Sequence, residues 1–308
     1  MNPALRLRGL AAATGVALVF ASANAAAFCR SRTCEQSGAC AADENGCIID
    51  GLLLYRSVGC VSFSVQEDAS PRHGIDSDTM DRLVQDAFDR WTEADCGGES
   101  PSIRIESFGP VECDRVEYSS DQGNANVILF HNEEWPEELD ARAFALTTVS
   151  FETRTGEIYD ADMEINAAME GGLSFGEPED GTDLPSILTH EVGHFLGLAH
   201  SLAGGAVMRP SYAPMVDNLR VLGEDDVDGI CAVYPPDREV GSNSCEPRHG
   251  FASACASFGG SLNAAGGCSF SAPAPSTPGS STAALALVGL GAAMLFRRRR
   301  RSAQARGA

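Results

Sequence analysis

The stretch "HEVGHFLGLAH", residues 190–200, constrains this chain more than any other part of its sequence. On a helix, His190 and His194 lie on one face, because they are four residues apart. Two imidazole nitrogens at that spacing can bind one Zn²⁺ ion. Gly197 can take a positive φ and end the helix, so that the chain turns back and brings His200 to the metal. The pattern predicts a zinc site whose fourth position stays open, which is typical of catalytic zinc.

Glu191 directly follows the first of these histidines. At this position its carboxylate can reach a water at the metal and act as a general base. Two alternatives are an ordinary amphipathic helix that carries histidines, and a zinc site that catalyses no reaction. The five fixed positions of the pattern argue against the first alternative, and Glu191 argues against the second.

The full pattern resembles the HExxHxxGxxH signature of the metzincin metalloproteases, and Ser201 after it resembles the matrixin variant. The stretch "AVMRPSY" (206–212) is similar to the Met-turn of this clan, and "GEDDVDGICAVYP" (223–235) is similar to the matrixin C-terminal helix. The resemblance covers residues 60–236. It implies an α+β catalytic domain with a twisted five-stranded mixed sheet, long helices, and zinc at the floor of the active-site cleft.

The resemblance also implies a role for each matching residue. The zinc ligands are His190, His194 and His200. Glu191 is the base and proton shuttle, and Met208 packs beneath the metal without binding it. Pro210 and Tyr212 line the pocket for the side chain that follows the scissile bond. The stretch "ALTTVSF" (145–151) resembles the edge strand that pairs with an extended substrate through backbone groups.

Periodicity and composition divide the rest of the domain into elements. The predicted strands are 60–66, 102–108, 125–131, 145–151 and 157–165. Helical spacing of apolar residues predicts helices over 76–94 and 184–196. The acidic alternation of Asp160, Asp162 and Glu164 resembles a matrixin calcium-binding segment, and alternate positions share one strand face. A solvated acidic face is the alternative to calcium binding.

The sequence departs from the matrixin pattern before residue 60. It has no Pro-Arg-Cys-Gly segment there, so the matrixin cysteine switch is absent as written. A cysteine of the 29–60 cluster could cap the zinc instead, but pairing in disulfides is the preferred interpretation. The paired histidines of a structural zinc site are also missing, and His73 and His131 are interpreted as ordinary surface or strand residues.

The N-terminus predicts export. In residues 1–25, two arginines precede an apolar run, and small residues allow cleavage after Ala25 or Ala27. A buried helix or a membrane anchor is the alternative. Export to an oxidising compartment explains the 11 cysteines, most of which should pair in a connectivity that the sequence leaves open. Residues 26–59 are therefore expected to form a disulfide-stapled extension, and residues 237–268 a cysteine-containing tail.

Residues 269–308 predict a sorting segment. Cys268 near a glycine, a Pro/Ser spacer, the apolar run 283–296 and five arginines resemble the MYXO-CTERM class of C-terminal tails. The resemblance implies processing and lipid attachment at Cys268, through sorting machinery and the membrane, and leaves ten cysteines for five bridges. A retained membrane anchor is the alternative, although the run spans only about 21 Å of a roughly 30 Å hydrocarbon core.

The net charge of the chain excludes some classes of binding partner. Without the eight arginines of residues 1–25 and 269–308, 14 basic residues stand against 43 acidic ones. Such a body repels nucleic acid and anionic membranes. The sequence therefore predicts an exported, monomeric, cell-surface zinc endopeptidase that cleaves extended polypeptides. A surface or adhesion protein that binds zinc without cleaving, and a peptidase restricted to small peptides, are the alternatives.

Overall fold

The computed structural model describes residues 28–34, 40–176, 181–211, 219–256 and 267–273. The predicted signal segment, Tyr212 and the apolar run 283–296 lie outside these ranges. The chain divides into two compact units, residues 1–275 and 276–308, and only the first contains described residues. Within the described ranges, no helix combines the length and the apolar character needed to cross a membrane.

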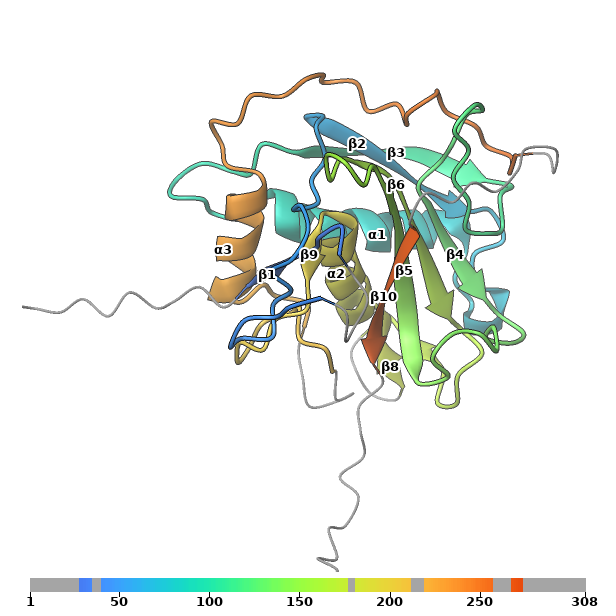
Figure 1. Cartoon of the computed structure of the whole chain (residues 1–308). Coiled ribbons are helices and arrows are strands. Elements are labelled where there is room, and N and C mark those ends of the chain that lie inside the picture. The colour runs from blue at the N-terminus through green and yellow to red at the C-terminus, as the bar shows by residue number, and fades with distance from the viewer. Residues whose placement is uncertain (1–27, 35–39, 177–180, 212–218, 257–266, 274–308) are drawn as a thin grey trace, which may run out of the picture. The chain divides into compact units, whose positions relative to one another are not determined.

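A mixed β-sheet forms one layer of the molecule (Figure 1). Its strand order is β10-β5-β6-β4-β2-β3. The bounds are β2 (Cys60–Gln66), β3 (Arg104–Val111), β4 (Val127–His131), β5 (Ala143–Phe151), β6 (Ile158–Asn166) and β10 (Gly267–Pro273). The pairs β3–β2, β2–β4 and β4–β6 are parallel, whereas β5 pairs antiparallel with both of its neighbours, β6 and β10. The predicted five-stranded mixed sheet is confirmed, and β10 adds a sixth strand that the sequence did not predict.

Two helices, α1 (Ser77–Thr92) and α2 (Leu184–Phe195), pack together against the sheet. The carboxylate of Asp76 accepts a hydrogen bond from the backbone N–H of Thr79 at 2.8 Å, which caps the first turn of α1. The ring centroid of Phe88 lies 5.3 Å from that of Phe63 on β2 and 5.0 Å from that of Phe195 on α2. These aromatic contacts join the sheet to both helices in one core.

The shorter elements lie near the two ends of α2. They are β1 (Cys29–Arg30), β7 (Leu173–Ser174), β8 (Thr182–Asp183), β9 (Leu198–Ala199), α3 (Glu224–Val233) and the 3-10 helix Pro71–His73. Strand β8 and its partner β7 lie before the helix, and β9, β1 and α3 lie beyond it. Strand β1 pairs with β9, and β7 pairs with β8. The N-terminal extension therefore packs against the segment that follows the histidine-bearing helix.

Five disulfides connect the ten cysteines other than Cys268. They are Cys29–Cys47, Cys34–Cys40, Cys60–Cys245, Cys96–Cys231 and Cys113–Cys255. Every cysteine of the 29–60 cluster is paired, so the hypothesis that one of them caps the zinc is wrong. Two bridges tie the predicted cysteine-containing tail (237–268) to the rest of the domain, since Cys245 pairs with Cys60 on β2 and Cys255 pairs with Cys113 just after β3.

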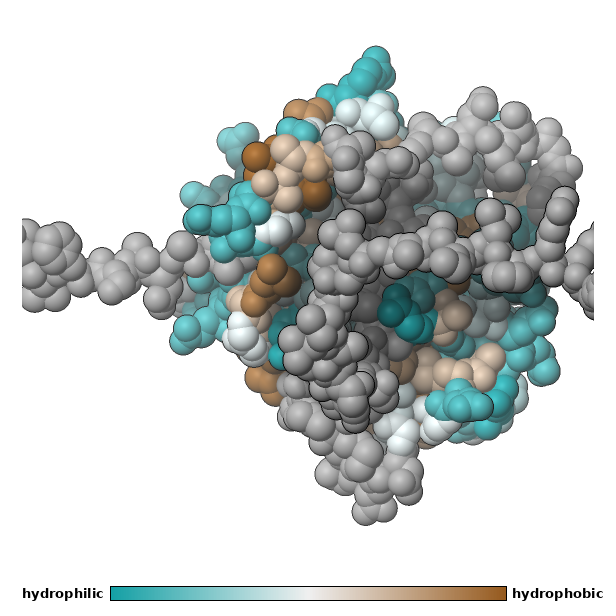
Figure 2. Space-filling model, turned by 60° about the horizontal axis from the view of Figure 1, so that its bottom comes forward, coloured by the Kyte–Doolittle hydropathy of each residue, from teal (hydrophilic) through white to brown (hydrophobic). Residues whose placement is uncertain are grey.

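The surface is polar with small apolar interruptions. Figure 2 shows hydrophobic residues as small groups among hydrophilic ones on the described part of that face. The exposed large apolar side chains of the described ranges are Ile49, Leu52, Phe175, Leu202, Val221 and Phe251. Single exposed apolar residues are normal on soluble domains.

Candidate metal centre

Helix α2 begins where the sequence predicted. Pro185 lies in its first turn, and the Asp183 carboxylate accepts hydrogen bonds from the backbone N–H of Ser186 at 3.1 Å and from its hydroxyl at 2.6 Å. Burial acts to raise the pKa of Asp183, but the hydrogen bonds from Arg220 and Ser186 together hold this pKa below its usual value, so the cap stays ionised. All residues of α2 are buried, so its histidines are largely shielded from solvent.

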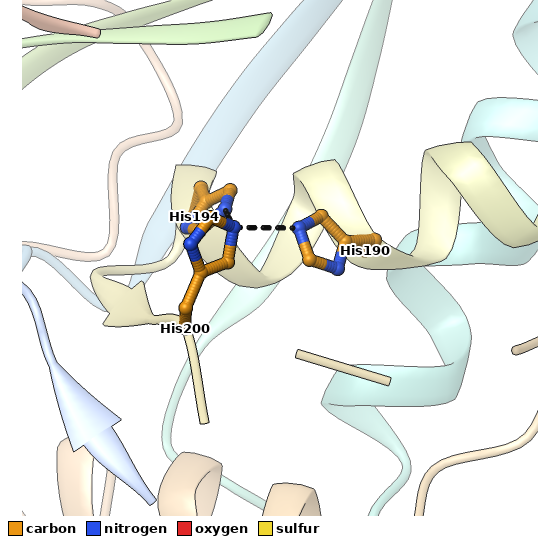
Figure 3. A group of neighbouring side chains, drawn as sticks. All are labelled: His190, His194 and His200. Carbon is orange, nitrogen blue, oxygen red and sulfur yellow. Dashed lines mark hydrogen bonds between the residues drawn. The ribbon is translucent and has the colours of Figure 1, made fainter. Parts of the chain in front are cut away.

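The three histidines converge in space (Figure 3). His190 and His194 lie on α2, which ends at Phe195, and Gly197 turns the chain with φ +96°. The Nε2 atom of His200 lies 3.3 Å from Nε2 of His190 and 3.2 Å from Nε2 of His194. A side chain at position 197 would be strained at this positive φ, so the turn to the third histidine depends on glycine.

Hydrogen bonds to backbone carbonyl groups determine which nitrogen carries the proton in His190 and His194. Nδ1 of His190 lies 2.7 Å from the carbonyl of Val207, and Nδ1 of His194 lies 2.9 Å from the carbonyl of Leu198. Because a carbonyl only accepts hydrogen bonds, both Nδ1 atoms carry the protons and both Nε2 atoms present lone pairs. Burial lowers the pKa of His190 to about 4 and that of His200 to about 3, so the rings are neutral ligands at neutral pH.

This nitrogen triad fits zinc. The Nε2 atom of His200 lies 3.2–3.3 Å from those of His190 and His194, a spacing at which three lone pairs can point at one cation. Tetrahedral zinc with Zn–N bonds of 2.0–2.1 Å places its ligand atoms roughly 3.3–3.4 Å apart, which matches the spacing of the nitrogens. The carbonyl partners of the Nδ1 protons supply the outer support that zinc-binding histidines usually have.

The predicted general base is held in place from the sheet. Glu191 is fully buried, and its Oε2 accepts a hydrogen bond of 2.7 Å from the hydroxyl of Thr147 on β5. Sequence reasoning missed Thr147. Its only signal was its place among the three polar residues of "ALTTVSF" (145–151), and nothing in the sequence distinguished it from the other two.

The predicted Met-turn lies against α2. Met208 is buried, and its backbone carbonyl accepts a hydrogen bond of 2.7 Å from the N–H of Ser201. The carboxylate of Asp226 on α3 accepts from the backbone N–H groups of Val207 (2.6 Å) and Met208 (3.1 Å). Asp226 therefore fixes the carbonyl of Val207 that holds His190. The resemblance of residues 223–235 to the matrixin C-terminal helix predicted α3, but it did not predict this contact.

The acidic residues of β6 have different partners. Two backbone N–H groups donate to Asp162, and Glu164 lies 2.8 Å from Nε2 of His131. Burial raises the pKa of Asp160 to about 8, and Arg56 acts against this shift. The solvated acidic face is wrong, because Asp160 and Asp162 are 2% and 1% exposed. Among the described residues these three carboxylates do not form one ligand cluster, and calcium binding stays a prediction.

The outer edge of β5 is paired with an extended segment of the same chain. Strand β10 runs antiparallel to it, with Ser269 opposite Thr148 and Phe270 opposite Thr147. This is the edge at which the sequence predicted an extended substrate. Of the predicted pocket residues, Pro210 is half-buried, whereas Tyr212 lies outside the described residues.

Comparison with known proteins agrees with this geometry. The profile of the family described as Matrixin matches residues 58–235. Neutrophil collagenase of Homo sapiens is 30% identical over 170 residues, which cover 54% of this chain and 30% of the relative. Metalloendoproteinase 1 of Glycine max is 29% identical over 170 residues, 54% of this chain and 48% of the relative. Matrix metalloproteinase-16 of Rattus norvegicus is 46% identical over 189 residues, 58% of this chain and 27% of the relative. The chain thus spans about a quarter to a half of the length of these relatives.

Proposed function

Because the chain belongs to the matrixin family, whose profile matches more than half of its residues, we propose that it is an exported zinc endopeptidase. The observation that carries the proposal is the convergence of three Nε2 atoms next to the buried carboxylate of Glu191. Three largely buried imidazoles whose Nε2 atoms meet at one point are the donor set of catalytic zinc.

The residues of the site divide the chemistry among them. A zinc ion held by His190, His194 and His200 would supply a Lewis acid that polarises the scissile carbonyl and activates water. The Glu191 carboxylate takes a proton from the attacking water and passes it to the nitrogen of the leaving amine. The hydroxyl of Thr147 orients that carboxylate through Oε2.

The substrate we propose is an extended polypeptide. The pairing with β10 supports this class, because the edge of β5 accepts an antiparallel strand through its backbone groups. Backbone pairing requires an extended conformation but little sequence, so side-chain preference comes from the pocket near Pro210. The alternative of a zinc-binding surface protein without activity leaves the buried contact between Thr147 and Glu191 unexplained.

The remaining parts of the proposal concern location and additional ions. Five disulfides support export after cleavage at Ala25 or Ala27. We propose that the exported protein acts as a monomer and that processing at Cys268 attaches it to the cell surface. Calcium binding stays a prediction of the resemblance, which the backbone hydrogen bonds of Asp162 and the raised pKa of Asp160 do not support. Intact-mass analysis of the exported protein tests the processing, since retention of residues 283–308 would contradict it.

Cleavage of a quenched fluorescent peptide library by the exported, oxidised protein tests the activity. We expect cleavage that stops after chelation and returns with zinc. We expect Glu191→Ala to keep stoichiometric zinc and lose most of the activity. A folded wild type that binds zinc stoichiometrically but cleaves no peptide in the library would contradict the endopeptidase function.

A further inference from the structure

The strand β1 lies outside the segment that the family profile matches, yet it contacts the zinc site. It pairs antiparallel with β9, placing Cys29 opposite Ala199 and Arg30 opposite Leu198. Ala199 immediately precedes the third zinc ligand. The two-residue strand β9 has no other partner among the described sheets, so β1 is its only strand neighbour there.

Ser31, directly after β1, holds both carbonyl groups of the turn that leads to His200. Its backbone N–H donates to the carbonyl of Gly197 at 2.9 Å. Its buried hydroxyl donates to the carbonyl of Leu198, also at 2.9 Å. The same Leu198 carbonyl accepts the Nδ1 proton of His194. A carbonyl oxygen has two lone pairs, so one oxygen serves a zinc ligand and the N-terminal extension together.

The segment around Leu54, also in the N-terminal extension, holds Ser31 and Arg30 in place through hydrogen bonds. The backbone N–H of Leu54 donates to the carbonyl of Ser31 at 2.8 Å, and Arg30 donates to the carbonyl of Leu54 at 3.2 Å. Leu54 is fully buried in the core. The disulfide Cys29–Cys47 closes this arrangement, since it joins β1 to the rest of the extension.

We propose that the N-terminal extension helps to position the zinc ligands, with Ser31 as a positioning residue for His194 and His200. Its hydroxyl fixes the Leu198 carbonyl that orients one ligand. Its backbone fixes the turn that places the other. The disulfide Cys29–Cys47 holds the strand in register, so reduction of this bridge weakens zinc binding. The inference rests on the zinc ligands of the proposed function, but not on proteolytic activity.

The first test is Ser31→Ala in the full-length exported protein. The zinc dissociation constant is measured by competition with a chromophoric chelator, and the visible spectrum is recorded after Co²⁺ replaces zinc. Loss of an outer partner of a metal ligand typically weakens metal binding by 10–100-fold, and we expect about tenfold here. We expect an altered Co²⁺ spectrum and recovery of affinity in Ser31→Thr. The melting temperature of the chelated protein should fall by only about 1–6 °C, as loss of one buried hydrogen bond predicts.

The second test compares two disulfides of the same extension. Cys29→Ser/Cys47→Ser removes the bridge that holds β1, and Cys34→Ser/Cys40→Ser removes the neighbouring bridge as a matched control. We expect at least tenfold weaker zinc binding in the first variant and a change below about twofold in the control.

Two results would overturn the inference. One is zinc affinity and a Co²⁺ spectrum of Ser31→Ala that equal those of the wild type. The other is an equal loss of zinc in both disulfide variants, which would indicate a general loss of stability. If a disulfide variant does not fold, Ser31→Ala decides alone. A protein that shows the expected zinc effects but cleaves no peptide would refute the endopeptidase function and leave this inference standing.

Discussion

Replacement of Gly193 by alanine tests whether close packing of α2 against the predicted Met-turn stabilises the fold. Gly193 lies inside α2, where alanine is favoured over glycine by about 1 kcal/mol of helix propensity. The tertiary structure predicts instead that alanine at this position lowers the stability of the fold. A Cβ atom here would overlap Sδ of Met208 and lie 2.9 Å from Cζ2 of Trp91, whereas carbon contacts need about 3.5–4.0 Å.

Neither neighbour can retreat at low cost. Trp91 is fully buried and its Nε1–H donates to the carbonyl of Thr189 at 2.8 Å. Met208 is 2% exposed, and its backbone is held by Asp226. Overpacking costs about 1–3 kcal/mol, and two buried obstacles favour the upper end. After the gain in propensity, a net loss of about 2 kcal/mol remains, which lowers the melting temperature of a domain of this size by roughly 4–8 °C.

The assay is thermal unfolding of the chelated and zinc-loaded protein, together with the zinc dissociation constant. Zinc affinity should fall as well, because a displaced Met208 moves the adjacent Val207 carbonyl away from His190. Gly204→Ala is the control, since a Cβ there meets open space, and we expect a change within about 0.5 kcal/mol. A higher melting temperature in Gly193→Ala with unchanged zinc affinity would refute the reasoning.

Three further predictions follow from other contacts. Thr147→Val removes the donor to Glu191; since hydrogen bonds to charged groups contribute about 1.5–3 kcal/mol, kcat/KM for an extended peptide should fall roughly 10- to 100-fold at full zinc occupancy, and an unchanged value would disprove the positioning role. Asp160 is protonated in the fold up to about pH 8 but ionised in the unfolded chain above about pH 4, so wild-type stability should decline relative to Asp160→Asn as pH rises from 5 to 8; urea midpoints that change in parallel would contradict this. Deletion of residues 257–308 frees the edge of β5, so long extended peptides should be cleaved faster than by the full chain, and equal rates would show that β10 does not compete with substrate.

Local patterns explain most of the secondary structure. The stretch 60–66 is strand β2 with the predicted bounds, and the helices predicted over 76–94 and 184–196 are α1 and α2 within a few residues. The Asp76 cap and Pro185 in the first turn of α2 needed only neighbours a few positions away. Such features were predictable because a helix or strand repeats its own geometry, and the apolar period records which face is buried.

Contacts between distant segments could not be predicted in this way. Asp160 and Asp162 have the alternation of a solvated or calcium-binding face, but the fold buries them near Arg56, about a hundred residues earlier in the sequence. The strand β10 follows a segment with no strand period, and its pairing depends on the open edge of β5. Burial and pairing partners are set by packing, which a local period does not contain.

The sequence by itself was enough to select the zinc ligands and the base that we propose, because the spacing of His190, Glu191, His194, Gly197 and His200 is that of a helix followed by a turn. It also determined that ten cysteines could pair. Only the tertiary structure decided which cysteines pair, and which groups hold the ligands. Thr147 reaches Glu191 across 44 positions, and Ser31 reaches Leu198 across 167. Contacts of that separation arise when the sheet, the helices and the extension close around one core, and no local pattern records them.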